Sequence, residues 1–201
     1  MCKSSLLLVF TVCAVAQEMP TFGTTVSATS GLQGNLYLLK PGRMELPSFK
    51  GLRPVGAVYT TSLQIAPRPF NDGFPGITDR FEWFALDYTG RFWVDQPGVY
   101  RFRLLSDDGS KLYINGKLLI DNDGVHAPQT IEGAAEFSRG VYRLRLSYFQ
   151  GPRQYVALVL SVLKPAAANW SIFDTNDFKP PADLSEWLPG ALRNIKRGST
   201  F

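Results

Sequence analysis

Residues 101–128, RFRLLSDDGSKLYINGKLLIDNDGVHAP, contain a strand, a tight acidic loop, a hairpin and a second acidic turn in direct succession. Before the first loop, apolar Phe102 and Leu104 alternate with arginines, as in a strand with one buried and one solvated face. Asn115 and Gly116 separate two apolar runs, and both residue types tolerate positive φ. This stretch therefore predicts antiparallel strands, with a type I′ hairpin at Asn115-Gly116.

The same period of two extends outward along the chain. Residues 142–148 alternate apolar and polar side chains, and residues 155–163 are apolar at nearly every position, as in an interior strand covered on both sides. The chain has 18 glycines and 14 prolines. One or the other interrupts every candidate helix between residues 31 and 163. Short strands at this spacing predict an all-β, antiparallel two-sheet β-sandwich.

Large aromatic side chains on the apolar faces of these strands are expected to form the core rather than a cofactor site. The predicted core stripe is Phe81, Trp83, Phe102, Tyr142 and Tyr148.

Residues 1–16 have the pattern of a signal peptide: Lys3, an apolar run over residues 6–15, and the A-x-A sequence ending at Ala16. The run is too short to span a bilayer. It predicts export to a secreted, extracellular or periplasmic location, and no membrane-spanning segment. Both cysteines, Cys2 and Cys13, lie in this segment, so a mature chain would have no disulfide.

The remaining chain is expected to divide into three parts. Residues 17–30 form a polar N-terminal lead-in, residues 31–163 form one sandwich domain, and residues 164–201 form a mostly irregular tail that contains several prolines. The tail is expected either to pack on the sandwich or to bind a cell-surface protein partner, through three aromatic residues: Trp170, Phe173 and Trp187.

Charge and motifs argue against two classes of function. The formal net charge of +4 comes from scattered arginines and lysines rather than one dense basic face, so no nucleic-acid partner is expected. The chain has no Gly-x-Ser-x-Gly, phosphate-binding loop or HExxH sequence. We therefore expect no enzymatic activity and no catalytic residues.

In the order strand, SDDGS loop, glycine hairpin and LLIDNDG, residues 101–128 resemble the PA-14 (protective-antigen-type) domain family. The flanking pieces GNLYLL, TDRFEWFALDYTGRFWVDQPGVY and GVYRLRLSYFQGPRQYVALVLSV extend the resemblance to residues 31–163. It implies a two-sheet sandwich of the kind present in exported bacterial proteins, toxins, glycosidases and yeast adhesins. Fold alone does not define function.

Asp107 and Asp108 are the candidate metal ligands. Adjacent side chains of an extended strand point to opposite faces, so a sharp bend is needed to direct both carboxylates at one ion. The lectin members of the family make this bend with a cis peptide, and the resemblance implies the same for Asp107-Asp108. Calcium is the expected cofactor, since it prefers carboxylate, carbonyl and water oxygens.

In those lectins a later loop completes the calcium coordination, and the corresponding loop is Phe149–Gln154. The resemblance implies ligands from Gln150, Gly151 and Arg153, although the yeast adhesins place Asn or Asp where this chain has Gln150. Two vicinal sugar hydroxyls would then complete the coordination of the ion. The candidate carbohydrate contacts are Asp107, Asp108, Arg153, Gln154, Asn122, His126 and Tyr155.

Structural explanations remain open for each of these residues. The two aspartates are also compatible with a loop in which they only accept hydrogen bonds from backbone amides. Residues 121–124 fit a tight turn beside the first loop, and a lone histidine, His126, fits a hydrogen-bonding role. Two functions follow: a calcium-dependent carbohydrate-binding adhesion module, or a structural or assembly module of the cell envelope in which calcium only rigidifies loops.

Overall fold

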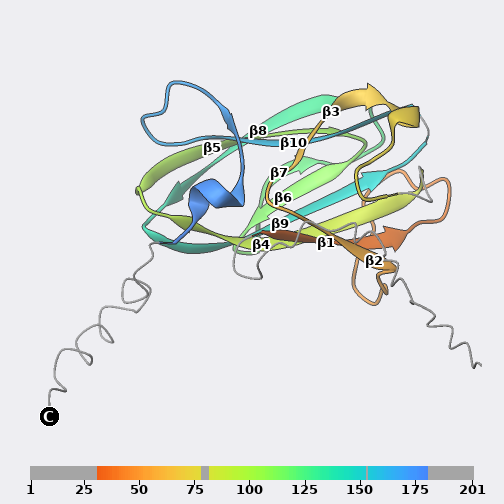
Figure 1. The fold of residues 1–201 in the computed structure, drawn as a ribbon. Coiled ribbons are helices and arrows are strands. Elements are labelled where there is room, and N and C mark those ends of the chain that lie inside the picture. Colours follow the sequence, from red (N-terminus) through yellow and green to blue (C-terminus); the bar gives the residue numbers. More distant parts are fainter. Residues whose placement is uncertain (1–30, 78–81, 153, 181–201) are drawn as a thin grey trace, which may run out of the picture.

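The computed structural model describes residues 31–77, 82–152 and 154–180 (Figure 1). The described chain forms two antiparallel sheets and contains no helix beyond two short 3-10 turns, η1 (Phe70–Asp72) and η2 (Thr175–Phe178). The predicted all-β sandwich is therefore confirmed. None of its described helical turns is long and apolar enough to cross a bilayer. The predicted signal peptide and lead-in lie outside the described residues.

The first sheet has the strand order β2-β1-β4-β9-β6-β7. Long central strands β4 and β9 pair along their whole length, from Phe84 opposite Gln150 to Val94 opposite Gly140. The strands of this sheet are β1 (Leu32–Leu38), β2 (Gly56–Thr60), β4 (Phe84–Val94), β6 (Ser110–Ile114), β7 (Lys117–Asn122) and β9 (Gly140–Gln150).

The second sheet has the order β11-β10-β5-β8, and β3 also pairs with β10. Its strands are β3 (Gln64–Pro69), β5 (Gly98–Asp107), β8 (Gln129–Phe137), β10 (Tyr155–Leu163) and β11 (Ser171–Ile172). The apolar run over residues 155–163 is thus an interior strand, as expected.

The hairpin prediction is confirmed as well. Asn115 and Gly116 connect β6 to β7 with φ values of 50° and 81°, both in the left-handed region that a type I′ turn requires.

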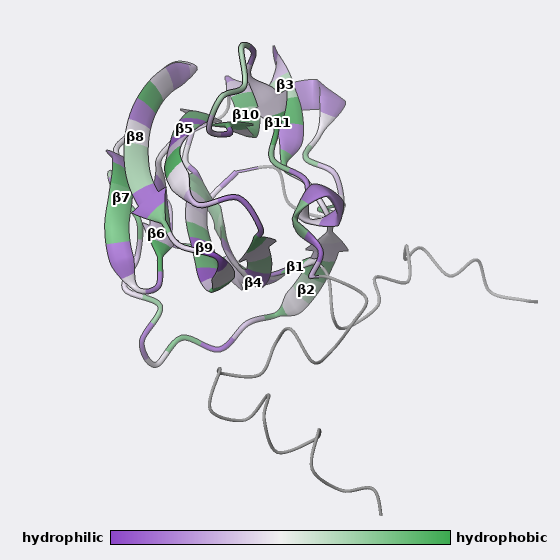
Figure 2. Ribbon diagram, turned by 90° about the vertical axis from the view of Figure 1, so that its left-hand side faces the viewer, coloured by the Kyte–Doolittle hydropathy of each residue, from purple (hydrophilic) through white to green (hydrophobic). Residues whose placement is uncertain are grey.

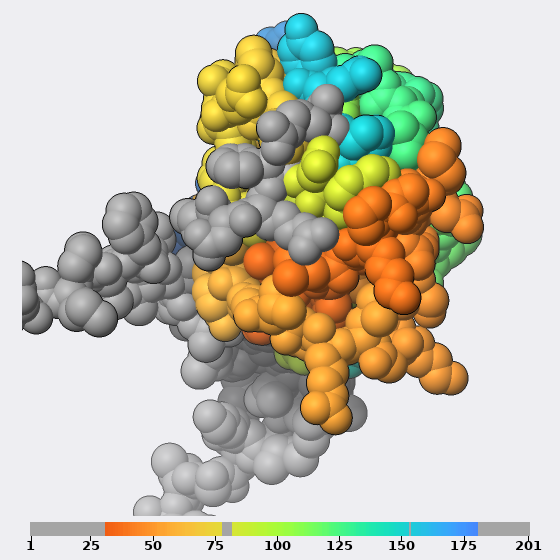
Figure 3. All heavy atoms as spheres, turned by 90° about the vertical axis from the view of Figure 1, so that its right-hand side faces the viewer, coloured from red at the N-terminus to blue at the C-terminus, as the bar shows by residue number. Residues whose placement is uncertain are grey.

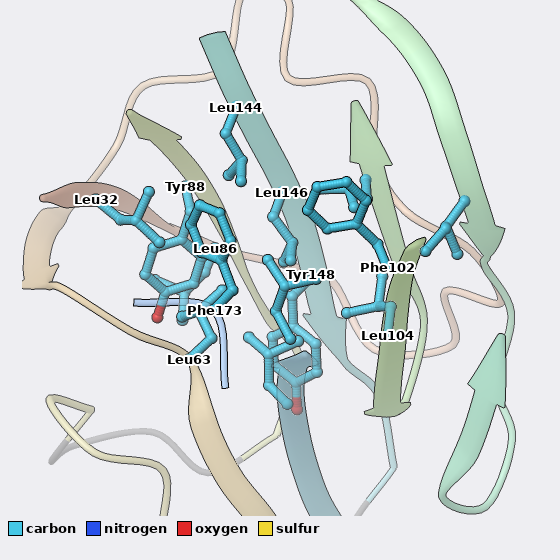
Figure 4. Close-up of a cluster of buried hydrophobic side chains, with 14 of the residues drawn as sticks. Leu32, Leu63, Leu86, Tyr88, Phe102, Leu104, Leu144, Leu146, Tyr148 and Phe173 are labelled. Carbon is cyan, nitrogen blue, oxygen red and sulfur yellow. The ribbon is translucent and has the colours of Figure 1, made fainter. Parts of the chain in front are cut away.

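The core lies between the two sheets, where inward-facing side chains of both interdigitate (Figure 4). Alternate residues supply it, as the changing hydropathy along β8 illustrates (Figure 2). Fully buried members from the first sheet include Leu86, Leu146 and Tyr148, and those from the second include Phe102 and Leu104.

The predicted aromatic stripe is correct only in part. Phe102 and Tyr148 are in the main core and Tyr142 packs against it, whereas Phe81 lies outside the described residues. Trp83 precedes β4 with φ 59° and packs in a second cluster, on the outer side of the first sheet. The alternation along this segment places Phe84, Leu86 and Tyr88 in the main core, and Trp83 with Ala85 on the outer face.

Packing continues beyond residue 163, where the tail was expected to begin. β11 pairs with β10, and the backbone N–H of Phe173 donates to the Leu160 carbonyl. The side chains of Phe173 and Phe178 are buried in the main core and stack with centroids 4.9 Å apart. Of the two alternatives left open for the tail, Phe173 follows the first and packs on the sandwich, whereas Trp187 lies outside the described residues.

The connection between β1 and β2, residues 39–55, covers one end of the outer face of the first sheet. Leu46 and Phe49 of this connection pack with Ala85 and Phe149. In the space-filling view of Figure 3, orange atoms of this part of the chain lie beside lime atoms around the start of β4. The connection therefore supports the end of the sandwich at which β5 and β9 terminate.

Candidate functional site

The turn between β5 and β6 brings Asp107 and Asp108 below the molecular surface. Their exposed fractions are only 4% and 3%, and the peptide bond between them is cis, as predicted. The neck of the turn is closed by a 2.6 Å hydrogen bond between the hydroxyls of Ser106 and Ser110. Gly109 leaves no space for a side chain, since a Cβ there would collide with the Phe149 ring. The two adjacent carboxylates are thus held by a tightly packed turn.

Three loops meet at the Asp108 carboxylate. Its Oδ2 accepts hydrogen bonds from the backbone N–H of Gly151 at 2.7 Å and from the side-chain amide of Gln150 at 3.3 Å. Its Oδ1 accepts from the backbone N–H of His126 at 3.1 Å. The structure therefore brings the Asp107-Asp108 turn together with the loop after β9, as expected, and also with the loop after β7.

Gln150 is fully buried and lies between Tyr148 and Asp108. Its Nε2 also donates to the Tyr155 carbonyl at 3.1 Å, and its Oε1 accepts from the Tyr148 hydroxyl. The same hydroxyl lies 2.7 Å from the Asp107 carbonyl. A phenol has one hydrogen and cannot donate fully to two acceptors. The Tyr148 hydroxyl therefore faces one acceptor more than it can satisfy.

The Asp107 carboxylate differs from that of Asp108, because no described residue donates a hydrogen bond or an ion pair to it. Burial and then the charge of Asp108 raise the pKa of Asp107 from 3.8 to about 7, while His126 acts in the opposite direction. Burial also raises the pKa of Asp108, opposed by the N–H groups of Gly151 and His126. Within the described chain no third His, Cys, Asp or Glu joins the pair to form a metal-binding cluster.

Asn122, the last residue of β7, and His126, in the loop that follows, occupy structural positions. Asn122 is 3% exposed, and its amide donates to the Ser106 hydroxyl at 2.9 Å and the Gln129 carbonyl at 3.1 Å. Such burial removes Asn122 from the side chains that could contact a sugar. The ring nitrogens of His126 lie 2.9 Å from the Ala127 carbonyl and 3.1 Å from the Asn122 carbonyl, in agreement with the hydrogen-bonding role.

At the rim of the site, the side chains of Gln154 and Tyr155 are exposed, with Tyr155 at 49%. Gln154 ends the loop after β9 and Tyr155 begins β10, where its carbonyl accepts from the Gln150 side chain. Arg153, the remaining predicted metal and sugar contact, lies outside the described residues.

Asp123 is a structural residue whose role the sequence did not define. Its Oδ1 accepts from the backbone N–H of Leu46 at 2.8 Å and from Gly124 at 2.9 Å, and its Oδ2 pairs with Lys111 at 3.0 Å. These contacts tie the turn at residues 121–124 to the 39–55 connection, so the turn braces that connection. The only sequence signal was the Asp-Gly turn itself, and nothing in it indicated Leu46 as a partner.

The fold and the site define a class: an antiparallel β-sandwich whose loops at one end converge on a buried pair of adjacent aspartates. A family model described as the PA14 domain matches residues 72–182, more than half of the chain. The chain belongs to the PA14 domain family. No curated protein matches the sequence.

Solved structures show the same fold at low sequence identity. A PA14 sugar-binding domain from an RTX adhesin has a TM-score of 0.61 at 18% identity, covering 74% of this chain and 97% of that one. The epithelial adhesin 9 A domain from Candida glabrata, in complex with Galb1-3GlcNAc, has a TM-score of 0.54 at 14% identity, covering 74% and 88%.

An anti-sigma factor domain-containing protein from Clostridium clariflavum is also similar, with a TM-score of 0.59 at 18% identity. The match covers 76% of this chain but 48% of that protein, so the chain spans about half its length.

Proposed function

We propose that this chain is a secreted, non-catalytic module that binds carbohydrate through calcium held by Asp107 and Asp108. The observation that carries the proposal is the pair itself. Two adjacent carboxylates are buried together, and no lysine or arginine among the described residues forms an ion pair with them. Burying uncompensated charge is costly, so such a pair fits a dication. The sugar-binding adhesin domain and the adhesin–disaccharide complex among similar structures support carbohydrate as the ligand.

The residues around the pair can supply neutral oxygen ligands, which calcium accepts readily. A half-turn of the Gln150 side-chain amide would direct its N–H groups at the Tyr148 hydroxyl and its oxygen toward Asp108. This orientation removes the excess of acceptors at Tyr148. It also gives up the bond to the Tyr155 carbonyl and sets the amide oxygen against both that carbonyl and the Asp108 carboxylate, which only a cation makes favourable. Gln150 therefore remains our proposed ligand, together with Gly151 and Arg153.

When bound, calcium would offer open coordination positions to two vicinal sugar hydroxyls. Gln154 and Tyr155 would contact the sugar from the rim, Tyr155 by packing its exposed ring on a pyranose face. The braced turn at residues 121–124 would hold His126 so that its N–H keeps Asp108 oriented.

The alternative is a structural or assembly module in which calcium only stiffens the loops. The similar fold of an anti-sigma factor domain-containing protein favours this alternative. The tail would then contact a surface protein.

A glycan array probed with the whole secreted chain tests the two functions. We expect binding in calcium that disappears on addition of a chelator and returns when calcium is restored. Under the alternative, calcium raises the melting temperature but no glycan binds. Binding that persists in chelator would exclude the calcium mechanism, whereas an array with no binding under any condition would exclude the carbohydrate function.

The proposal also predicts a pH dependence, because Asp107 must be ionised to hold calcium. Its raised pKa means that the folded, metal-free state disfavours the charged carboxylate. The stability contributed by this group is therefore fully present below the unfolded pKa near 3.8 and is lost as pH rises through about 7. Calcium can compensate the negative charge of Asp107 only at a pH at which this carboxyl group is ionised.

We expect the calcium-induced rise in melting temperature to be small near pH 5 and large near pH 8. Scanning fluorimetry with calcium and with chelator, across this pH range, measures it. Calorimetric titration near neutral pH, in buffers of different ionisation enthalpy, should report proton release on binding. A calcium effect of equal size at both ends of the range would contradict the role of Asp107.

A further inference from the structure

A pair of arginines on the outer face of the first sheet has no acidic partner in the described chain. Arg91 on β4 lies directly opposite Arg143 on β9, and both side chains are exposed. Directly opposed side chains of an antiparallel pair lie on the same face with Cβ atoms about 4.5–5.5 Å apart. Two like charges in this arrangement destabilise the sheet unless an anion lies between them.

Three other strand arginines lie beside carboxylates, Arg145 on β9 and Arg101 and Arg103 on β5 of the second sheet. Arg145 donates to Asp87 at 2.8 Å, and Arg101 and Arg103 both pair with Glu132 at 2.7 Å. Of the five arginines on β4, β5 and β9, only the two that face one another, Arg91 and Arg143, have no carboxylate among the described residues.

The backbone around the pair is well ordered by its neighbours. The N–H of Arg143 donates to the Asn115 side chain at 2.8 Å, and the N–H of Asn115 donates to the Arg143 carbonyl at 2.8 Å. The hairpin thus holds β9 from one side, while β4 holds it from the other. Both guanidinium groups project from rigid strands rather than from a loop.

The pair is separate from the aspartate site. It lies seven residues along the β4–β9 ladder from Phe84 and Gln150, about 23 Å at about 3.3 Å per residue. Two guanidinium groups with this spacing suit one or two carboxylate or sulfate groups, which arginine binds in a planar, bidentate manner.

We propose that Arg91 and Arg143 form a second, calcium-independent contact for an acidic polysaccharide that carries carboxylate or sulfate groups. A nucleic acid fits less well, because phosphate backbones are bound by longer basic tracks and the neighbouring Arg145 is paired with Asp87. The choice of a polysaccharide over an acidic protein rests on the proposed carbohydrate function.

Binding of the whole chain to polygalacturonate, dextran sulfate and neutral dextran, measured in chelator by interferometry, tests the pair. We expect both acidic polymers to bind, more weakly as salt is raised, and neutral dextran not to bind. The double variant Arg91→Gln/Arg143→Gln should lose at least about tenfold in affinity, equivalent to about 1.4 kcal/mol. The control Lys50→Gln/Arg53→Gln removes the same charge from exposed positions and should bind like the wild type.

The proposal is overturned if the arginine variant binds like the wild type, or if the control loses as much affinity. Tighter arginine-dependent binding to duplex DNA, to acidic vesicles or to a polyglutamate peptide would overturn the choice of ligand. All of these measurements are made in chelator, so a negative result speaks against the arginine contact and not against the calcium site. Conversely, a glycan array without calcium-dependent binding speaks against the calcium site and not against the arginine contact.

Discussion

Replacing Asp107 with Asn is expected to lower calcium affinity at least about a hundredfold, equivalent to about 2.8 kcal/mol. The same change should leave the metal-free protein as stable as the wild type, or more stable, near pH 8. Both effects follow from one geometry: the carboxylate is buried beside Asp108 and accepts no hydrogen bond from a described residue. Calorimetric titration with calcium and thermal unfolding in chelator measure the two effects.

The control is Asp121→Asn, which removes one negative charge from the next turn. Asp121 is half exposed, and its Oδ1 accepts a hydrogen bond that an amide oxygen can also accept. We expect calcium affinity to change less than about threefold, as for an exposed charge. If Asp107→Asn instead destabilises the metal-free protein and calcium has no effect on the wild type, the pair is only a structural turn.

Replacing Phe173 with Ala is expected to cost about 3–5 kcal/mol of unfolding free energy, the usual penalty for truncating a buried phenylalanine. The side chain is fully buried and meets the rings of Phe92 and Phe178 at centroid distances of 5.4 and 4.9 Å. It therefore fills the core between the sheets, although it lies in the segment first assigned to an irregular tail. Urea unfolding followed by tryptophan fluorescence measures the loss.

Trp170→Ala is the matched control, three residues earlier in the same segment. Its ring packs on the guanidinium of Arg103 at 4.2 Å, on the outer surface of the second sheet. Trp170 is only half-buried, so losing part of its burial and a cation–π contact of about 0.5–1 kcal/mol should cost clearly less than truncating the fully buried Phe173. A Phe173 variant as stable as the Trp170 variant would mean that residues 164–180 are not part of the cooperative fold.

Local patterns defined most of the fold. Period-two alternation identified the strands, and Asn115-Gly116 placed the hairpin, because both signals act over a few residues. Trp83 was assigned to the wrong face, because Phe84, Leu86 and Tyr88 form a second apolar set with the same period of two and supply the core. Alternation alone does not tell which of two apolar sets faces the other sheet.

The candidate site was predictable only where family motifs describe it. The motif indicated the Asp107-Asp108 pair, its cis peptide and the loop after β9. It did not indicate that Asn122 is buried. It also did not indicate that the backbone N–H of His126 donates to Asp108, because backbone N–H groups carry no residue-specific signal.

The amino-acid sequence by itself determined which segments are strands, where the hairpin turns and which acidic pair could hold a metal ion. Only the tertiary structure decided that Phe173 completes the core, that Asp123 joins the 39–55 connection, and that Arg91 faces Arg143. These are contacts between residues distant along the chain. Their partners are set by strand order and register, which depend on the packing of both sheets together rather than on any local pattern.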